Sequence, residues 1–273
     1  MNELVPWNRI INTKALRRTI IRMAKAGNSV HLGSSFSIVE IVATLYQDFV
    51  RLNWHNRNDP NRDILALSKG HGVMALYSVF YDLGWLSDKE IDNYFASTNV
   101  LKGLSSANVS GIEVSGGSLG HGISVATGIA LAAKLKNTDQ RVFAIVGDGE
   151  MDEGSVWESL MIAAHFELKN LIVIIDVNKF QAMGQSKPGA NIRNFKEKLL
   201  AFNFETEIVD GHNQKDLALC FDSLLKSESN HPKAVIANTI KGRGVSFMEN
   251  DNNWHYLRMD DASYSQALRE LSE

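Results

Sequence analysis

Several residue types and patterns are scarce in this sequence of 273 residues, and each scarcity excludes a class of protein. Cys220 is the single cysteine, which excludes an internal disulfide framework and a cysteine-rich metal site. No apolar run approaches the roughly 18 to 20 residues that a membrane span requires. Lys and Arg number 28 against 31 Asp and Glu, so the basic excess typical of nucleic-acid-binding proteins is missing. We therefore expect a globular protein that binds neither membrane nor nucleic acid.

The chain also lacks the features of a targeting segment or a linker. It starts Met-Asn-Glu-Leu-Val-Pro-Trp, without the basic start and apolar stretch of a signal peptide. Together with the single cysteine, this start predicts a reducing compartment, the cytoplasm. There are only 4 prolines and no low-complexity tract that would divide the chain. We expect a single domain over residues 1–273.

Short apolar runs alternate with longer helical stretches through most of the chain. The runs lack polar alternation, which is typical of parallel strands buried on both faces. They lie at residues 63–67, 142–146, 171–175 and 234–238. The helical stretches lie at residues 12–26, 38–50, 73–83, 123–136, 155–166 and 214–226. This order predicts an α/β fold, an open and mostly parallel sheet with helices on both faces.

Polar residues follow two of the expected strands at the point where each strand ends. Asp148 lies between two glycines after the run 142–146, and Asn178 follows the run 171–175. In a parallel sheet such neighbours meet at the carboxyl edge, where ligands bind. Carboxylate, amide and carbonyl oxygens suit Mg²⁺ or Ca²⁺, whose shells are often completed by phosphate oxygens. The pair predicts a metal-bridged diphosphate, although either residue alone would be an ordinary turn residue.

The motifs around these residues resemble the transketolase family of thiamine-diphosphate enzymes. The similarity extends over about residues 12–258, and the motifs stand in the family's order. The motifs are Ser68-Lys-Gly-His-Gly72, Gly117-Ser-Leu-Gly-His-Gly-Ile-Ser124, Gly147-Asp-Gly-Glu-Met-Asp-Glu-Gly154 with Trp157-Glu158, Asn178, Asp210-Gly-His-Asn213 and Thr239-Ile-Lys-Gly-Arg-Gly-Val-Ser246. The resemblance implies the thiamine-diphosphate-binding fold, in the domain that binds the diphosphate.

The resemblance also implies which residues hold the cofactor. Asp148, Asn178 and the carbonyl of Phe180 would bind Mg²⁺, for which Ca²⁺ or Mn²⁺ can substitute, against thiamine diphosphate. The N–H of Gly149 would contact a phosphate. The glycine-rich turn at Gly117 would approach the cofactor closely, and Leu119 would pack near its rings; helix capping alone is the alternative for this turn. These assignments rest on matching positions.

Three histidines match catalytic positions of the family. By resemblance, His31 lies near the reacting carbons, His71 faces the diphosphate and the substrate, and His255 reaches the diphosphate and the donor hydroxyls. Histidine suits proton transfer at neutral pH.

Two carboxylates match family positions at the subunit interface. Glu153 and Glu158 correspond to residues that connect two active sites there, and Glu153 is also expected beside the cofactor. Acidic residues in the first turn of a helix stabilise its dipole without any further role, and this alternative stays open.

The chain departs from the family in two ways. Leu104, in Lys102-Gly-Leu-Ser-Ser106, stands where the family carries a histidine that contacts the sugar, so the ordinary pentose phosphates are in doubt and an altered ketose or acceptor is indicated. The chain ends at Glu273, near the end of the family's first domain. We therefore expect the pyrimidine-binding and C-terminal domains on a partner chain, in an α2β2 heterotetramer.

These observations lead to one main hypothesis and two alternatives. The main hypothesis is the N-terminal subunit of a transketolase, which transfers a two-carbon ketol unit from a ketose or ketose phosphate to an aldose. The first alternative is another thiamine-diphosphate activity, either 2-oxo-acid decarboxylation or a condensation of the deoxyxylulose-phosphate type. The second alternative is a non-catalytic binding module that retains the cofactor half.

Overall fold

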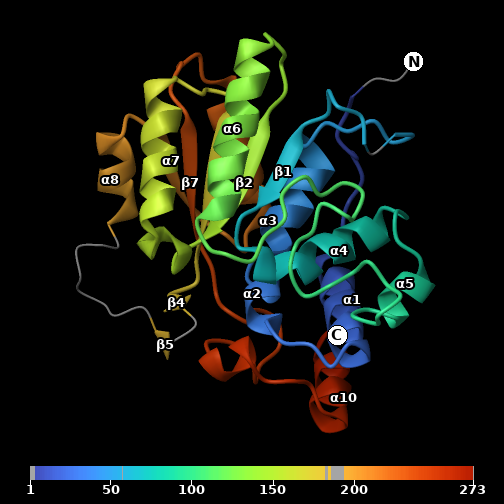
Figure 1. Cartoon of the computed structure of the whole chain (residues 1–273). Coiled ribbons are helices and arrows are strands. Elements are labelled where there is room, and N and C mark those ends of the chain that lie inside the picture. Colours follow the sequence, from blue (N-terminus) through green and yellow to red (C-terminus); the bar gives the residue numbers. More distant parts are fainter. Residues whose placement is uncertain (1–3, 57, 182–183, 186–193, 273) are drawn as a thin grey trace.

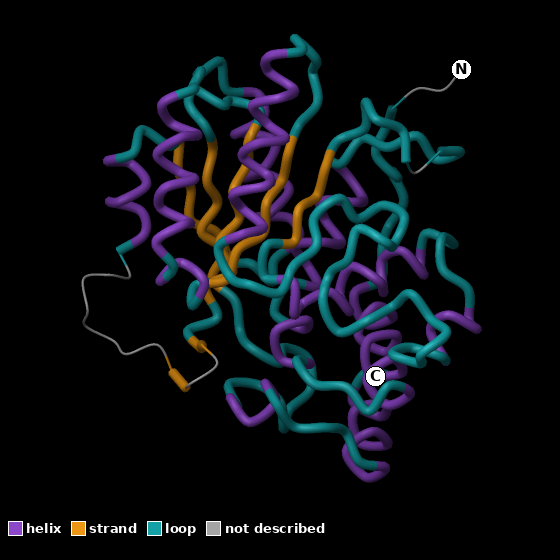
Figure 2. The backbone as a smooth tube through the Cα atoms, in the orientation of Figure 1, coloured by secondary structure: helices purple, strands orange, loops and turns teal. Residues whose placement is uncertain are grey.

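The computed structural model describes residues 4–56, 58–181, 184–185 and 194–272. Its centre is a five-stranded sheet in the order β1-β2-β3-β7-β6, and every neighbouring pair is parallel. The strands are β1 (Ile64–Leu67), β2 (Val142–Gly147), β3 (Leu171–Val177), β6 (Glu205–Asp210) and β7 (Lys233–Asn238). Figure 2 shows these strands side by side with helices on both sides. The predicted fold class and all four predicted strands are confirmed.

Within the five-stranded sheet, β6 at one edge is the strand that the sequence analysis missed. It pairs only with β7, and its sequence Glu-Thr-Glu-Ile-Val-Asp mixes polar and apolar residues. Thr206 and Val209 are buried, whereas Ile208 is half exposed. Because part of β6 is exposed, it lacks the continuous apolar run by which buried parallel strands are recognised. Strand β1, at the other edge, is buried along its whole length and has such a run.

Alternate residues of the strands pack into two separate hydrophobic cores, one on each face of the sheet. On one face, Phe143, Ile145, Ile172 and Ile174 pack with α1 (Thr13–Ala26), α3 (Val39–Thr44), α4 (Val73–Asp82), α9 (Gln214–Lys226) and α10 (Asp261–Glu270). On the other, Ala144, Val146, Val173 and Ile175 pack with α6 (His121–Leu135), α7 (Gly154–His165) and α8 (Phe195–Ala201). Figure 1 shows α6 and α7 side by side in front of the sheet. This two-sided burial explains the apolar runs.

The predicted helices are present, with one change of geometry. The stretch 38–50 forms α3 followed by a π-helical segment, η1 (Leu45–Phe49). Helix α1 begins where the Asn12 side chain accepts a hydrogen bond from the Ala15 N–H, and Asn213 caps α9 in the same way. Side-chain caps satisfy backbone donors that the first turn of a helix leaves unpaired. Among the described residues, no helix is long and apolar enough to cross a membrane.

The short elements and long loops gather at the carboxyl ends of the strands. They are α2 (Leu32–Phe36), η2 (Gly70–Gly72), η3 (Glu150–Asp152), η5 (Asn252–His255), β4 (Phe180–Gln181) and β5 (Gly184–Gln185), while α5 (Asp88–Asp92) lies against α1. In Figure 1 this edge is the lower end of the sheet, from which β4 leaves. Segments distant in the sequence therefore meet at one edge.

Candidate active site

One cavity of about 360 Å³ at this edge collects the residues singled out from the sequence. Its lining includes every predicted catalytic, cofactor-binding and metal-binding residue: His31, His71, Gly117, Leu119, Asp148, Gly149, Glu153, Asn178, Phe180 and His255. Leu104 lines it as well. The cavity is thus built from the ends of β2 and β3, the starts of α2, α6 and α7, and the η2 and η5 segments.

Asp148 and Asn178 lie next to each other because β2 and β3 are paired neighbours. Gly147 stands in register with Asp176, and the Asp148 carboxylate accepts a hydrogen bond from the Lys179 N–H at 2.9 Å. The Asp148 and Asn178 side chains are 2% and 6% exposed. The neighbourhood predicted for these two residues is therefore present.

Asp176, to which the sequence analysis gave no role, holds several side chains at this edge of the sheet in place. Its carboxylate accepts hydrogen bonds from the Asn178 Nδ2 at 2.9 Å, the Ser37 hydroxyl at 2.7 Å and the Thr239 hydroxyl. Lys69 Nζ lies 2.5 Å from it. Burial alone raises the pKa of this carboxyl, but the ammonium and these donors outweigh burial and lower it. The signal in the sequence is one acid within an otherwise apolar strand, since a buried charge requires a partner.

The oxygen atoms at this edge fit a hard divalent cation. No cluster of three or more His, Cys, Asp or Glu side chains that could hold a metal ion occurs in the described part of the chain. A cation here would instead use the Asp148 carboxylate, the Asn178 amide oxygen and the Phe180 carbonyl, with phosphate and water oxygens completing the shell.

Gly149 packs closely against Gln181 of β4, beside these donors. A Cβ at this position would lie 2.9 Å from the Gln181 Cβ, so any larger residue would clash. Its N–H is 2.9 Å from the Asp148 carboxylate in the absence of a ligand. The close approach of backbone to backbone at this turn explains why glycine stands there.

Glu150 is a buried carboxylate that the sequence analysis also missed. It accepts hydrogen bonds from the Ser68 hydroxyl at 2.6 Å and from the N–H groups of Gly120 and Gly147, at 2.8 and 3.1 Å. Burial raises the pKa of its carboxyl despite these donors. The carboxylate thereby ties the end of β2 to the glycine-rich turn that begins α6.

The three predicted histidines form a cluster on one wall of the cavity. Ring centroids are 5.4 Å apart for His31 and His71, 4.9 Å for His31 and His255, and 5.5 Å for His71 and His255. His31 has a left-handed backbone, φ +70°, and its N–H donates to the His255 carbonyl at 3.0 Å. This bond joins segments from near the two ends of the chain.

Burial favours the neutral form of all three imidazoles. Burial is the main cause of the lowered pKa of His31 and His71, and positive neighbours add to it. Burial and Lys241 lower the pKa of His255 to about 3. Its Nδ1 is 3.2 Å from the Lys241 ammonium, which can only donate. The neutral ring of His255 therefore carries its proton on Nε2.

Lys241 is a further cation that the sequence analysis gave no role. It lines the cavity, and Nζ donates to the Asn252 side chain at 2.6 Å. Burial and the nearby Lys69 lower the pKa of Lys241 to about 8. Lys69 is already paired with Asp176, so Lys241 is the lining cation whose charge a bound anion would offset.

Gly117 and Leu104 approach each other in the cavity lining. Gly117 has φ +154°, and a Cβ there would lie 3.3 Å from the Leu104 Cδ1. The side chain of Leu104 is 41% exposed and faces the same cavity as the histidines. An apolar group therefore lines this part of the cavity.

The two carboxylates expected at an interface occupy different places. Glu153 lines the cavity. Glu158 lies one helical turn farther along α7, in a shallow groove of about 240 Å³ between α6 and α7.

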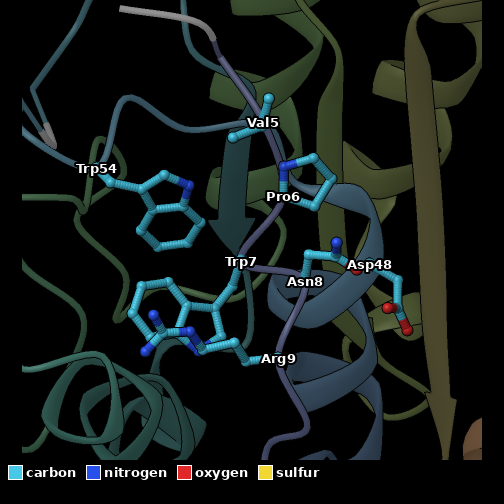
Figure 3. Close-up of a pocket in the computed structure, with 7 residues that line it drawn as sticks. All are labelled: Val5, Pro6, Trp7, Asn8, Arg9, Asp48 and Trp54. Carbon is cyan, nitrogen blue, oxygen red and sulfur yellow. The ribbon is translucent and has the colours of Figure 1, made fainter.

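A larger hollow, about 630 Å³, lies elsewhere, beside the N-terminal segment. Figure 3 shows its walls, which include the indoles of Trp7 and Trp54 and the side chain of Arg9. The two indole centroids are 4.6 Å apart, and the Arg9 guanidinium stacks on Trp7 at 4.7 Å. This hollow contains none of the predicted site residues, so the smaller cavity is the candidate site.

Comparison with known proteins identifies the family. A family model described as "Transketolase, thiamine diphosphate binding domain" matches residues 8–271. The chain belongs to the transketolase family. It is 34% identical to a subunit of the apulose-4-phosphate transketolase of Phocaeicola vulgatus, over 93% of this chain and 89% of that one. It is 33% identical to a 6-deoxy-6-sulfo-D-fructose transketolase subunit of Clostridium sp., over 89% and 88%.

Solved transketolases have the same fold. The Campylobacter jejuni enzyme superposes with a TM-score of 0.89 at 27% identity, over 95% of this chain and 42% of that one. The chain likewise spans 41% of human transketolase, at 33% identity. The predictions of family, fold, thiamine diphosphate and transketolase-type enzyme are confirmed. Both of the first two relatives are named as transketolase subunits.

Proposed function

We propose that residues 1–273 form the diphosphate-binding subunit of a split transketolase that moves a two-carbon ketol unit from a ketose donor to an aldose acceptor. The observation that carries the proposal is the cavity in which all ten predicted site residues meet. The pyrimidine-binding and C-terminal domains would reside on the partner chain.

The residues at the ends of β2 and β3 would hold the cofactor. Asp148, Asn178 and the Phe180 carbonyl would bind the cation, Mg²⁺ with Ca²⁺ or Mn²⁺ as substitutes. The Gly149 N–H and Lys241, which line the same cavity, would contact the diphosphate. When bound, thiamine diphosphate supplies the electron sink for breaking and forming carbon–carbon bonds. Gly117, Leu119 and Glu153 line the remaining wall.

The histidine cluster would bind the hydroxyl groups of the sugar and transfer protons between them. Neutral imidazoles both donate and accept hydrogen bonds, so His31, His71 and His255 can orient a polyol chain and move protons between its oxygens. The Nε2 proton of His255 is available for donation, because Lys241 donates to its Nδ1. Proton transfer by positioned histidines contributes typically 10² to 10⁴-fold to a rate.

The outer face of α6 and α7 is a reason to expect a larger assembly. We infer that this assembly is an α2β2 heterotetramer. This face exposes Val125, Met161 and Ile162, at 48%, 55% and 47%, around the groove that contains Glu158. Helices that remain at a surface are usually polar outward. An apolar outer face is typical of one covered by another protein chain. The single cysteine is consistent with a cytoplasmic complex.

The apolar side chain of Leu104 supports a ketose donor or an aldose acceptor other than the ordinary pentose phosphates. Its carbon side chain offers no hydrogen bond to a sugar hydroxyl. The relatives above are named for apulose 4-phosphate and for 6-deoxy-6-sulfo-D-fructose, both modified sugars. We therefore place the substrate among modified ketoses or their phosphates.

The decisive experiment is a ketol-transfer assay with thiamine diphosphate and Mg²⁺. The chain is assayed alone, then mixed with the C-terminal transketolase subunit of the same genome, with several ketoses and with pyruvate as donors. We expect ketol transfer only in the mixture. Decarboxylation of pyruvate would favour the alternative 2-oxo-acid chemistry, and condensation of pyruvate with the aldose would favour the deoxyxylulose-phosphate type. Cofactor binding without turnover of any donor would favour a non-catalytic module.

A further inference from the structure

Three polar side chains form a hydrogen-bonded chain outside the cavity, and the proposed function gives it no role. Glu40 of α3 accepts hydrogen bonds from Arg17 Nη1 at 2.6 Å and from Nη2 at 2.9 Å. His212, in the loop between β6 and α9, places Nδ1 2.9 Å from the same carboxylate. Burial alone would raise the pKa of the Glu40 carboxyl, but the hydrogen bonds from His212 and Arg17 lower it to about 2. The ionised carboxylate therefore joins an arginine of α1 to this histidine.

Both ends of this chain of side chains hold the loop that follows β7. The Ile240 N–H donates to His212 Nε2 at 2.7 Å. Arg17 Nε donates to the Arg243 carbonyl at 2.6 Å. These two attachments lie on either side of Lys241 in the sequence, and Glu40 couples them.

The hydrogen bonds of His212 fix its tautomer. A backbone N–H can only donate, so Nε2 is the acceptor and carries no proton. Nδ1 therefore carries the proton and donates it to Glu40. A hydrogen bond at one ring nitrogen decides the role of the other. Glu40 thus turns the acceptor of His212 towards the Ile240 N–H.

Close packing connects the loop backbone to the ammonium of Lys241. A Cβ at Gly33 would lie 2.9 Å from the Lys241 Cγ, and the Gly33 carbonyl accepts a hydrogen bond from the Gly242 N–H at 3.2 Å. Lys241 is 1% exposed, and its Nζ lies 3.2 Å from His255 Nδ1 in the cavity. Because the stem has little room to adjust, a shift of the loop would move the ammonium.

We propose that His212, held by Glu40 and Arg17, is a positioning residue that fixes the loop so that the ammonium of Lys241 faces the diphosphate. The inference rests on the proposed function, since it takes Lys241 as a contact of the cofactor. His212 is not one of the described residues that line the cavity, so it acts through the loop. A misplacement of about 1 Å caused by a remote residue can cost about 100-fold in rate.

Two substitutions separate the two hydrogen bonds of His212. In His212→Asn the amide NH₂ replaces Nδ1, so the bond to Glu40 is kept and the Ile240 N–H loses its acceptor. In His212→Gln the longer side chain brings an amide oxygen to the place of Nε2. His231→Asn is the control, because His231 is exposed and precedes β7, at the other end of the sheet from the cavity.

The measurement is fluorescence titration of the assembled complex, freed of cofactor, with thiamine diphosphate and Mg²⁺. We expect His212→Asn to raise the dissociation constant about tenfold, as for a weakened hydrogen bond to a charged group, and His212→Gln about threefold at most. His231→Asn should change nothing. Added to Lys241→Met, His212→Asn should have no further effect, because the group that it positions is gone.

Arg17→Lys tests the other attachment, should His212→Asn fail to fold. A lysine keeps a positive charge for Glu40 but lacks the Nε–H that holds the Arg243 carbonyl. It should also raise the dissociation constant of thiamine diphosphate, and only while Lys241 is present.

An equal rise on the parent and on the Lys241→Met background would overturn the inference and leave His212 with a purely structural role. Equal effects of His212→Asn and His212→Gln, or parent-like binding by His212→Asn, would overturn it as well. Failure of the proposed function looks different. In that case the parent complex would bind the cofactor with the expected differences among variants but would transfer no ketol unit.

Discussion

The ammonium group of Lys69 lies 2.5 Å from Oδ2 of Asp176, and both side chains are almost fully buried. Asp176 in turn accepts a hydrogen bond from the side chain of Asn178, so this ion pair supports a proposed metal ligand. The pair links η2, which carries His71, to the end of β3. Its removal should therefore affect both stability and the site.

We expect Asp176→Asn to destabilise the chain by about 3–5 kcal/mol, because it leaves Lys69 as an uncompensated buried charge. Adding Lys69→Met should recover part of that loss. The control is Asp222→Asn, which breaks an exposed pair with Lys226 on α9 and should cost less than about 1 kcal/mol. Urea unfolding measures all four proteins. Equal losses for the buried and the exposed pair would contradict this account.

Asp148→Ala should weaken Mg²⁺-dependent binding of thiamine diphosphate by about 100-fold or more, because it removes the charged ligand of the cation. Asp152→Ala is the matched control, since Asp152 is an exposed carboxylate that lines the same cavity. We expect it to change binding about threefold at most, as expected for an exposed charge in high dielectric. Cofactor titration by fluorescence, with and without EDTA, distinguishes the two. Unchanged binding in Asp148→Ala would show that the metal site lies elsewhere.

The free energy of unfolding should rise with pH between about 4 and 6.5, in part because of His255. Its pKa in the folded chain is about 3, against about 6.5 when unfolded. In that window the unfolded state binds more protons, so stability is lost as the pH falls. His255→Gln should reduce this change in the free energy of unfolding by about 3 kcal/mol over the window. Urea titrations at several pH values provide the measurement, and identical slopes in the two proteins would contradict the assignment.

Leu104→His should shift substrate preference towards the ordinary sugar phosphates. The imidazole would restore a hydrogen-bond donor at a wall that now offers only carbon, which is worth about 1 kcal/mol or more. We expect the KM for xylulose 5-phosphate to fall by about tenfold in the assembled enzyme. Leu104→Met, which keeps the wall apolar, should leave that KM unchanged. A fall with both variants would indicate looser packing rather than a new hydrogen bond.

Met161→Glu should prevent formation of the larger assembly, because it places a charge in the apolar outer face of α7. The matched control is Leu219→Glu on α9, where the leucine is 70% exposed on the other side of the sheet. Light scattering after size-exclusion chromatography of the mixed subunits gives the mass. Loss of assembly with Leu219→Glu but not with Met161→Glu would place the interface on α9.

The sequence by itself determined the sheet and the meeting of Asp148 with Asn178. Strands buried on both faces must be apolar throughout, and parallel neighbours bring their carboxyl ends to one edge. The family motifs then predicted that the three histidines belong to the same site. Strand β6 was not predicted, because its partial exposure allows polar residues in its sequence.

The tertiary structure alone decided which side chains complete the site. Asp176, Lys69 and Lys241 gain their roles only from contacts among β3, η2 and the loop after β7. Periodicity reports how each segment meets the core, whereas the path of a loop depends on what it packs against. Charge pairing and desolvation follow that path, so they could be found only after the chain was folded.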